Sequence, residues 1–341
     1  KILYESNSHE KLPPASMTKM MSMLLIMEAI DNNKLSFDSD VLISENAASM
    51  GGSQVFLEAG ETYKVKDLLK GIAIASGNDA VVAMAEKVGG TVENFVNMMN
   101  EKAKSLGLKD TVFKNPHGLD TEGHYSSAYD MAMIAKELLK HEKILEYTSI
   151  YEDYLKKNDG SSTWLVNTNK LVRFYDGVDG LKTGFTSSAK YCVTTTAKKS
   201  NMRLLSVVMG AETSDLRSKD TTNLLNYGFN TYKLDLIMSK TKILGNVKVE
   251  KGKKDNVDLV LKEDATSLKK INDKSTDYFV NLKVDNIKAP VKTGDKVGTA
   301  EILDNDGKFV MESDVTVTKN IDKANYFDYL KKNLKIITTG F

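Results

Sequence analysis

A serine and a lysine in this chain stand at a spacing that would let them act as a nucleophile and its base. Ser16 and Lys19 lie in the sequence Ser-Met-Thr-Lys, directly after Pro13-Pro14 and one alanine. In a helix this spacing places the hydroxyl and the amine on the same face. The helix N-terminus also offers unpaired backbone N–H groups and their positive field. A nucleophilic serine needs a base and an oxyanion site, and this segment can provide the first and part of the second.

The Ser-x-x-Lys pattern is not specific by itself. Only Ser16 opens a strongly apolar helical run, which continues to about Asp31. The alternative is that Ser16 is merely a helix cap and Lys19 a solvated lysine, and spacing alone does not decide between them. The same spacing recurs elsewhere in the chain, at Ser8/Lys11, Ser187/Lys190, Ser239/Lys242 and Ser267/Lys270.

Two further polar segments could complete such a site. Ser76–Asn78 separates two apolar runs and can project a hydroxyl and an amide into a cleft. The alternative is an ordinary turn between two helices, with Asp79 as the N-cap of the second helix. Lys182–Gly184 leads towards an apolar strand, where its lysine and threonine would lie along an edge that an extended substrate can join. The same tripeptide recurs at Lys292–Gly294, where Asp295 marks a tight turn, and we interpret that copy as structural.

Composition and charge exclude several other classes of protein. With 47 basic and 46 acidic residues the formal charge is +1, so no global field would hold nucleic acid. The single cysteine, Cys192, excludes an intramolecular disulfide and a multi-cysteine metal site. The histidines form no HExxH or HxH pattern, and His117 stands in a turn-like setting that favours a structural role. No glycine-rich phosphate loop stands between a strand and a helix, so we expect neither a metal nor a cofactor.

The first two thirds of the chain mix helices and strands. The 341 residues suggest two domains, at roughly 150 residues each. Apolar periodicity predicts helices over 16–31, 91–106, 127–138 and 214–227, and a hairpin with strands 191–197 and 203–209. After Asn230 the pattern is typical of a small all-β domain, with short strands expected over 248–249, 257–261, 278–284, 296–303 and 309–317.

The two ends of the chain bear on location. No apolar stretch reaches the roughly 18 residues of a spanning helix. The chain starts at Lys1 without a methionine, so we expect a processed form whose targeting segment has been removed. The end is predicted to be a basic amphipathic helix that either lies on an anionic membrane or packs on the β domain. Its apolar side would carry Tyr326, Leu330, Leu334 and Ile337, and its basic side Lys331, Lys332 and Lys335.

Taken in order, the three motifs resemble those of the penicillin-recognising serine acyltransferases, and most closely the low-molecular-mass penicillin-binding proteins, the serine D-alanyl-D-alanine carboxypeptidases. The resemblance implies an α/β (α+β) catalytic domain with a central antiparallel sheet flanked by helices. From the change of pattern after Asn230 we place the domain boundary near 233–244, which gives a catalytic domain over 1–235, a β-rich domain over 236–321 and an amphipathic helix over 322–341. A β domain followed by such a tail is also similar to this family. The resembling segments are Leu12–Lys19, Ala75–Ala80, Asn115–Asp120 and Asp179–Thr186.

The resemblance also implies roles for the catalytic residues. Ser16 would attack the penultimate carbonyl of a peptidoglycan stem peptide ending in D-Ala-D-Ala, and water would later release the acyl-enzyme. Lys19 would have to be neutral, although a free lysine has a pKa of about 10.4; desolvation and the charge of Lys182 would lower it. Ser76 would relay a proton to the leaving amine, and Asn78 would hold Lys19 and the substrate amide.

Further residues are expected to bind the substrate. The backbone N–H groups of the nucleophile and of Phe185 would form the oxyanion hole. Lys182 and Thr183 are the first choice for the terminal carboxylate, with Gly184 beside them. Arg217, at the start of a late helix, is a second anchor, or else an ordinary surface arginine.

Alternatives remain on the same fold, namely a β-lactamase, a DD-endopeptidase or a non-catalytic penicillin-binding scaffold. No Glu-x-x-Leu-Asn-like segment supplies a deacylating glutamate, which favours a peptidase. A scaffold would need neither Lys19 nor Asn78. We therefore expect a carboxypeptidase on the outer face of the bacterial cytoplasmic membrane. Its partners would be the stem peptide, β-lactams as covalent inhibitors and, through the tail, a membrane surface.

Overall fold

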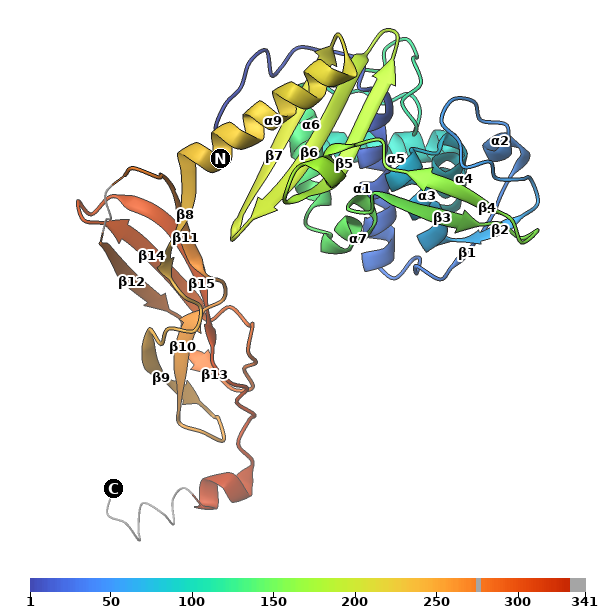
Figure 1. The fold of residues 1–341 in the computed structure, drawn as a ribbon. Coiled ribbons are helices and arrows are strands. Elements are labelled where there is room, and N and C mark those ends of the chain that lie inside the picture. Colours follow the sequence, from blue (N-terminus) through green and yellow to red (C-terminus); the bar gives the residue numbers. More distant parts are fainter. Residues whose placement is uncertain (274–276, 332–341) are drawn as a thin grey trace. The chain divides into compact units, whose positions relative to one another are not determined.

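The computed structural model describes residues 1–273 and 277–331, which form two compact units, Lys1–Asn230 and a second from Thr231 on (Figure 1). The first unit mixes helices and strands, as predicted. Its helices are η1 (Ala15–Thr18), α1 (Lys19–Asp31), α2 (Glu45–Ala48), α3 (Val65–Ala75), α4 (Asn78–Gly89), α5 (Val92–Ser105), α6 (Ala128–Leu138), η2 (Glu142–Ile144), α7 (Leu145–Thr148), α8 (Leu171–Phe174) and α9 (Ser214–Thr231).

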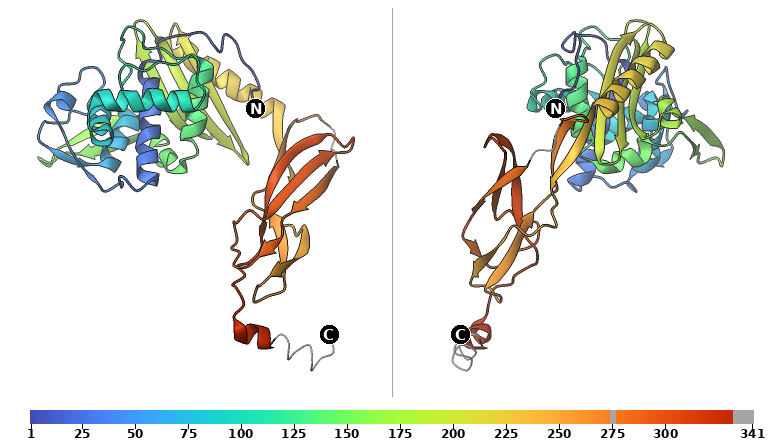
Figure 2. Two further views of the ribbon diagram at one scale, coloured as in Figure 1. Left: turned by 180° about the vertical axis from the view of Figure 1, so that it is seen from behind. Right: turned by 60° about the vertical axis from the view of Figure 1, so that its left-hand side comes forward.

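The centre of the first unit is an antiparallel sheet in the order β5–β6–β7. Its strands are β5 (Val178–Thr186), β6 (Lys190–Lys199) and β7 (Met202–Ala211), so the predicted hairpin is confirmed. Figures 1 and 2 show α9 along one face of this sheet and α1 and α6 on the other. Since β6 lies between its two neighbours, β5 occupies an edge of the sheet.

The helix that follows the Ser16 motif runs through the middle of the core. Met20, Met23, Leu24 and Met27 of α1 have no or almost no exposed surface. A helix that is apolar all round is buried on all sides, which gives its first turn a fixed position. The predicted helix is confirmed with one difference: its first three residues, 16–18, belong to the 3-10 turn η1, which precedes α1.

Two other predicted helices begin at polar caps, as their sequences indicate. Thr91 Oγ1 accepts a hydrogen bond of 3.1 Å from the Asn94 N–H at the start of α5. Ser127 Oγ accepts one of 3.2 Å from the Asp130 N–H at the start of α6. These bonds satisfy donors that a helix N-terminus leaves unpaired.

The sequence analysis missed two small antiparallel pairs of strands in this unit. Each strand is three to five residues long and half exposed, so its apolar alternation is too short to stand out. The first pair is β1 (Asp40–Leu42) with β2 (Thr62–Lys64), and the second is β3 (Glu152–Lys156) with β4 (Ser162–Val166).

The second unit is built of strands, which confirms the predicted all-β character. Alternate residues of its strands, such as Val257, Leu259 and Leu261, are buried in a core of their own. Six strands form one sheet in the order β12–β14–β15–β10–β9–β13, and β8 pairs with β11. Their bounds are β8 (Tyr232–Met238), β9 (Gly245–Glu250), β10 (Asn256–Leu261), β11 (Ala265–Lys270), β12 (Tyr278–Val284), β13 (Ile287–Lys288), β14 (Gly298–Asp304) and β15 (Phe309–Val317).

The predicted terminal helix is described only in part. Residues 326–331 are helical, and Tyr326, Phe327 and Leu330 are exposed. Leu334, Ile337, Lys332 and Lys335 lie outside the described residues.

Candidate active site

The start of α1 brings Ser16 and Lys19 together. Ser16 lies in η1 and Lys19 is the first residue of α1, so about one turn separates them. Lys19 Nζ lies 2.9 Å from Ser16 Oγ, within hydrogen-bond distance. Ser16 is only partly buried, which leaves its side accessible to a substrate. This is the contact that a serine nucleophile and its base require.

Lys19 is completely buried among polar partners. Its Nζ lies 2.7 Å from Asn78 Oδ1 and 2.8 Å from the His117 carbonyl oxygen. Burial lowers the pKa of Lys19 well below its ordinary value, and the charge of Lys182 lowers it further. The carboxylate of Asp79 acts in the opposite direction on this pKa. Because the two lowering effects dominate, the site favours the uncharged amine.

The Ser76–Asn78 triplet is the junction between α3 and α4. Ser76 ends α3 in the left-handed conformation, with φ 64°, and is buried. Its Oγ has no hydrogen-bond partner within the described residues. Asn78 Nδ2 donates to the Gly51 carbonyl oxygen at 2.7 Å, and this bond directs Asn78 Oδ1 towards Lys19. An unpaired buried hydroxyl on a left-handed residue is the kind of strain that gathers at functional sites.

Asp79 holds the loop beside this junction, a role that the sequence analysis missed. The alternative in which it caps α4 is wrong, because the N-cap residue is Gly77. The buried Asp79 carboxylate accepts hydrogen bonds from the backbone N–H groups of Val55 at 3.0 Å, Leu57 at 3.1 Å and Ala80 at 2.8 Å. These donors satisfy a buried carboxylate, and they fix segment 55–57 against α4.

The turn Asn115–Gly118 covers the first residues of α1 and presents the His117 carbonyl to Lys19. A Cβ on Gly118 would lie 1.8 Å from the Ala15 carbonyl oxygen, and its φ is +90°, so only glycine fits there. Burial lowers the pKa of the His117 ring to about 4, and the charge of Lys19 contributes. The contribution of His117 to the site is a main-chain oxygen, which no pattern of side chains reveals.

β5 passes directly beside the Ser16 turn. A Cβ on Gly184 would lie 2.7 Å from the Pro14 carbonyl oxygen and 3.1 Å from the Ser16 nitrogen. The third residue of the Lys-Thr-Gly motif is therefore glycine because the two backbones approach too closely for any side chain. This approach places the strand edge next to Ser16.

The two side chains that precede Gly184 on β5 are buried. Lys182 is 1% exposed, and burial together with the charge of Arg217 lowers its pKa to about 7. Its Nζ donates to the Thr183 carbonyl oxygen at 3.1 Å. Thr183 Oγ1 donates to Thr168 Oγ1 at 2.6 Å. Thr168 was not predicted, since nothing in its local sequence marks it as a partner of β5.

Phe185 and Arg217 differ in their surroundings. Phe185 is 54% exposed, and its ring lies 4.4 Å from that of Tyr191. Arg217 is 9% exposed in the first turn of α9, and burial lowers its pKa. None of the carboxylates in the described part of the chain forms an ion pair with Arg217. Because the Arg217 side chain is buried, it is not a surface arginine, and its charge lowers the pKa of Lys182.

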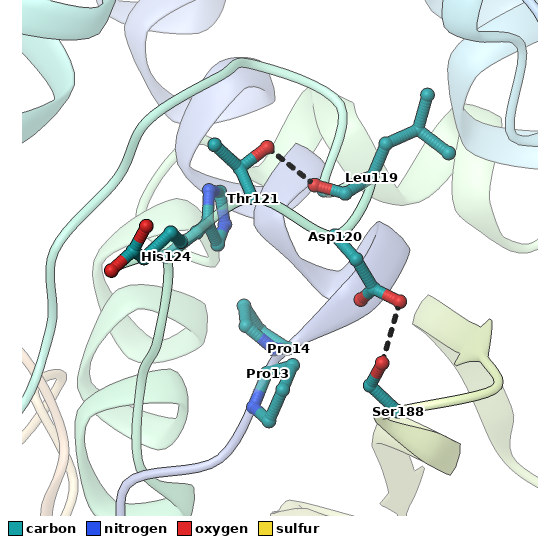
Figure 3. A pocket seen from close by; sticks show the side chains of 9 residues that line it. Pro13, Pro14, Leu119, Asp120, Thr121, His124 and Ser188 are labelled. Carbon is teal, nitrogen blue, oxygen red and sulfur yellow. Dashed lines mark hydrogen bonds between the residues drawn. The ribbon is translucent and has the colours of Figure 1, made fainter.

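A pocket of about 300 Å³ lies beside the two prolines that precede the Ser16 motif (Figure 3). Pro13, Pro14 and the loop around Asp120 line it. Asp120 accepts hydrogen bonds of 2.8 Å from both Thr186 Oγ1 and Ser188 Oγ, and so ties this loop to the turn after β5. Neither Lys19 nor Lys182 lines this pocket.

Within residues 1–273 and 277–331, no group of three or more histidine, cysteine or acidic side chains is arranged to hold a metal ion. Over those same residues, the helices are too short or too polar to cross a membrane. The fold and the paired serine and lysine define the class: a penicillin-recognising serine enzyme.

Comparison with known proteins identifies the family within that class. The D-alanyl-D-alanine carboxypeptidase model of the peptidase S11 family matches residues 1–213, and the penicillin-binding protein 5 C-terminal domain matches residues 232–323. The D-alanyl-D-alanine carboxypeptidase DacF of Bacillus subtilis is 51% identical over 98% of this chain and 86% of its own. The chain therefore belongs to the peptidase S11 family of D-alanyl-D-alanine carboxypeptidases, as its motifs predict.

Solved structures agree with this assignment. Penicillin-binding protein 5 of Haemophilus influenzae has a TM-score of 0.73 at 32% identity, over 95% of this chain and 94% of its own. Ampicillin-bound penicillin-binding protein D2 of Listeria monocytogenes has a TM-score of 0.60 at 34% identity, over 67% of this chain and 92% of its own. The activity of the chain is that of its family, a serine-type D-Ala-D-Ala carboxypeptidase.

Proposed function

We propose that Ser16 is the residue acylated by the stem peptide and by penicillins, and that uncharged Lys19 is its base. The observation that carries this assignment is the set of three partners around Lys19 Nζ. Asn78 Oδ1 and the His117 carbonyl can only accept hydrogen bonds, whereas the Ser16 hydroxyl can also donate one.

Three acceptors around the amine fit both of its protonation states. A charged Lys19 would donate to all three of them, Ser16 Oγ included. An uncharged lysine has two N–H donors and one lone pair. With its two N–H groups on Asn78 and His117, the lone pair would face the Ser16 hydroxyl. Proton transfer from Ser16 to Lys19 would then need no rearrangement of the amine.

Ser76 is suited to relay the proton onward. Its Oγ is buried and unpartnered in the described structure, so it is available to an incoming group. When the acyl-enzyme forms, protonated Lys19 would return its proton through Ser76 to the departing D-Ala nitrogen. The carboxylate of Asp79 raises the pKa of Lys19 and so supports its transient protonated state.

The substrate carboxylate would bind between Lys182, Thr183 and Arg217. Both residues are buried, and the charge of Arg217 lowers the pKa of Lys182, a repulsion that a bound carboxylate would offset. With its pKa at about 7, Lys182 would gain its full charge once the anion is in place. The charge of Lys182 would therefore depend on the bound ligand.

The oxyanion hole would consist of the Ser16 and Phe185 backbone N–H groups. The close approach of Gly184 to the Ser16 nitrogen supports this pairing, because Phe185 is the next residue of β5. The exposed Phe185 ring would then face the substrate side. In comparable enzymes each donor of this kind stabilises the transition state by roughly 3 kcal/mol.

The proposal extends to the location and division of the chain. Residues 1–235 would carry catalysis and 236–321 a supporting β domain. The segment 322–341 would bind an anionic membrane, since its described part exposes Tyr326 and Phe327 beside Lys331. The enzyme would act outside the cytoplasm, where its substrate is found.

Mass measurement of the intact protein after penicillin treatment tests the central assignment. We expect one added penicillin, mapped to the peptide containing Ser16, and D-Ala release from a free pentapeptide. Ser16→Ala should abolish both without changing the circular dichroism spectrum. An adduct on Ser76, or an adduct that survives in Ser16→Ala, would falsify the assignment.

A further inference from the structure

The β3–β4 hairpin carries an aromatic pair that the carboxypeptidase site does not use. Tyr154 and Trp164 are directly opposite each other in the antiparallel register. Opposite residues in such a pair have Cβ atoms about 5 Å apart and project from the same face. Tyr154 is 57% and Trp164 59% exposed, although neighbouring Leu155 and Leu165 are buried. Both large rings therefore project from the outer face of the hairpin, at opposite positions of its two strands.

Polar groups surround this pair on the same face. Lys156 pairs with Ser162 on one side of the rings, and Glu152 pairs with Val166 on the other. Side chains of alternate residues share a face, so these groups flank the rings. One acid and one base leave the face without net charge. An aromatic patch with a polar rim is typical of a binding surface.

The hairpin is held rigidly to the elements of the active site. On its inner face, Asp153 forms an ion pair of 2.9 Å with Lys70 of α3, and Lys70 Nζ also donates to the Tyr154 carbonyl oxygen at 2.9 Å. Thr163 Oγ1 donates to the Val55 carbonyl oxygen at 3.3 Å. Figure 1 shows the hairpin beside α3. The pair therefore sits on a fixed support.

The segment that follows the hairpin is hydrogen-bonded to β5. β4 ends at Val166, and Thr168, two residues later, accepts the hydrogen bond from Thr183 Oγ1. Val55, whose carbonyl oxygen accepts the hydrogen bond from Thr163, also donates its N–H to the carboxylate of Asp79. Asp79 is the residue next to Asn78. The aromatic face is thus connected, on both sides, to the residues that bind the stem peptide.

We propose that Tyr154 and Trp164 form a platform for the glycan strand to which the stem peptide is attached. A pyranose ring has a face of C–H bonds that packs flat against aromatic rings, while its hydroxyl and N-acetyl groups need hydrogen-bond partners at the edge. Because this face has no net charge, with Ser162, Lys156 and Glu152 at its rim, it fits such a neutral sugar better than an anion. The inference rests on the proposed carboxypeptidase function, since the glycan is part of that substrate.

Two substrates separate the platform from the catalytic site. Tyr154→Ala and Trp164→Ala should each lower kcat/KM on pentapeptide-rich peptidoglycan about tenfold, the usual effect of removing an aromatic anchor. Their turnover of free pentapeptide and their labelling by fluorescent penicillin should stay at the wild-type level. Trp164→Phe should retain most of the activity on peptidoglycan. The matched control is Phe309→Ala, which removes an equally exposed ring (57%) from the second unit and should change nothing.

Binding can also be observed without catalysis. Trp164 is the only tryptophan, so its fluorescence reports on this face alone. A β-1,4-linked N-acetylglucosamine tetramer should shift its emission to the blue in a saturable way. The shift should persist after penicillin has acylated the active site and disappear in Tyr154→Ala.

Several outcomes would overturn the platform. They are an unchanged emission up to the solubility limit of the tetramer, wild-type turnover of peptidoglycan by Trp164→Ala, or an equal loss on peptidoglycan and free pentapeptide. A wild-type protein inactive on free pentapeptide would instead contradict the carboxypeptidase proposal, and the tetramer titration would still be informative.

Discussion

The chain contains the tripeptide Lys-Thr-Gly twice, and the two copies have different environments. Lys182–Gly184 lies on a buried strand, where the lysine is 1% exposed and its pKa falls to about 7. Lys292–Gly294 lies on an exposed turn, where the Lys292 N–H donates to Asp295 Oδ2 at 2.8 Å. The interpretation of the second copy as a structural turn is thus confirmed.

The difference between the copies lies in what surrounds them. In the first copy, the charge of Arg217 lowers the pKa of the lysine, and the threonine hydroxyl donates a hydrogen bond to Thr168 Oγ1. The glycine packs against the backbone of the turn that contains Ser16. In the second, a Cβ on Gly294 would meet nothing within 4 Å, and the glycine is needed only for its φ of +96°. The same three residues are therefore packed into a buried site in one place and form a solvent-exposed turn in the other.

Substitution of the two lysines should give the largest contrast. Lys182→Ala removes a buried cation from the proposed carboxylate site, and we expect kcat/KM for a D-Ala-D-Ala peptide to fall about 10³-fold. Lys292→Ala should leave activity and melting temperature unchanged within error. Steady-state D-Ala release measures both variants, and comparable losses in the two would contradict the assignment of the first copy.

The two glycines should separate catalysis from stability. Gly184→Ala adds a Cβ at 2.7 Å from the Pro14 carbonyl oxygen, which would push β5 away from the Ser16 turn. A displacement of this kind can reduce the rate about 10²-fold, measured here as the rate of penicillin acylation. Gly294→Ala meets no atoms but forces a positive φ, so it should destabilise the second unit by about 1 kcal/mol and leave acylation intact. A stable, fully active Gly184→Ala enzyme would refute the close-approach argument.

The pH profile should show the two buried lysines of the site. At low pH Lys19 is protonated and cannot act as a base, so kcat/KM for the peptide should rise with pH as it deprotonates. Above about 7 the free enzyme loses the charge on Lys182, and kcat/KM should fall by up to about tenfold per pH unit. Lys182→Arg should move this fall to higher pH, because a guanidinium stays charged. Lys292→Ala serves as the control and should keep the wild-type profile.

Much of this site was predictable because its motifs lie on strongly patterned elements. Ser16 precedes an apolar run long enough to be a central helix, and Lys182 precedes a strand rich in valine and threonine. Local sequence therefore places both residues on buried elements. It does not bring the two elements together: the approach of β5 to the Ser16 turn depends on Gly184 fitting against Pro14, a long-range approach that only the fold reveals.

What the sequence analysis missed has a common physical cause. The His117 carbonyl, the Asp79 hydrogen bonds to segment 55–57 and the partner hydroxyl of Thr168 all involve the backbone or residues distant in sequence. The β3–β4 hairpin was missed because its strands are short and expose their aromatic residues instead of burying them. Motif spacing carries no information on either kind of contact.

Arg217 is the neighbouring charge that distinguishes the first copy of the tripeptide from the second, and its removal should have the smallest effect of these substitutions. Removing it should raise the pKa of Lys182, so the alkaline fall of kcat/KM in Arg217→Ala should move to higher pH. The loss of one charge-assisted hydrogen bond, roughly 1.5 kcal/mol, should also raise KM for D-Ala-D-Ala peptides about tenfold. Penicillin acylation should suffer less. Arg203 provides a matched control, because its guanidinium is already paired with Asp179 at 2.7 Å, and Arg203→Lys should leave the alkaline limb in place. An alkaline limb that stays put in Arg217→Ala would show that burial alone sets the pKa of Lys182.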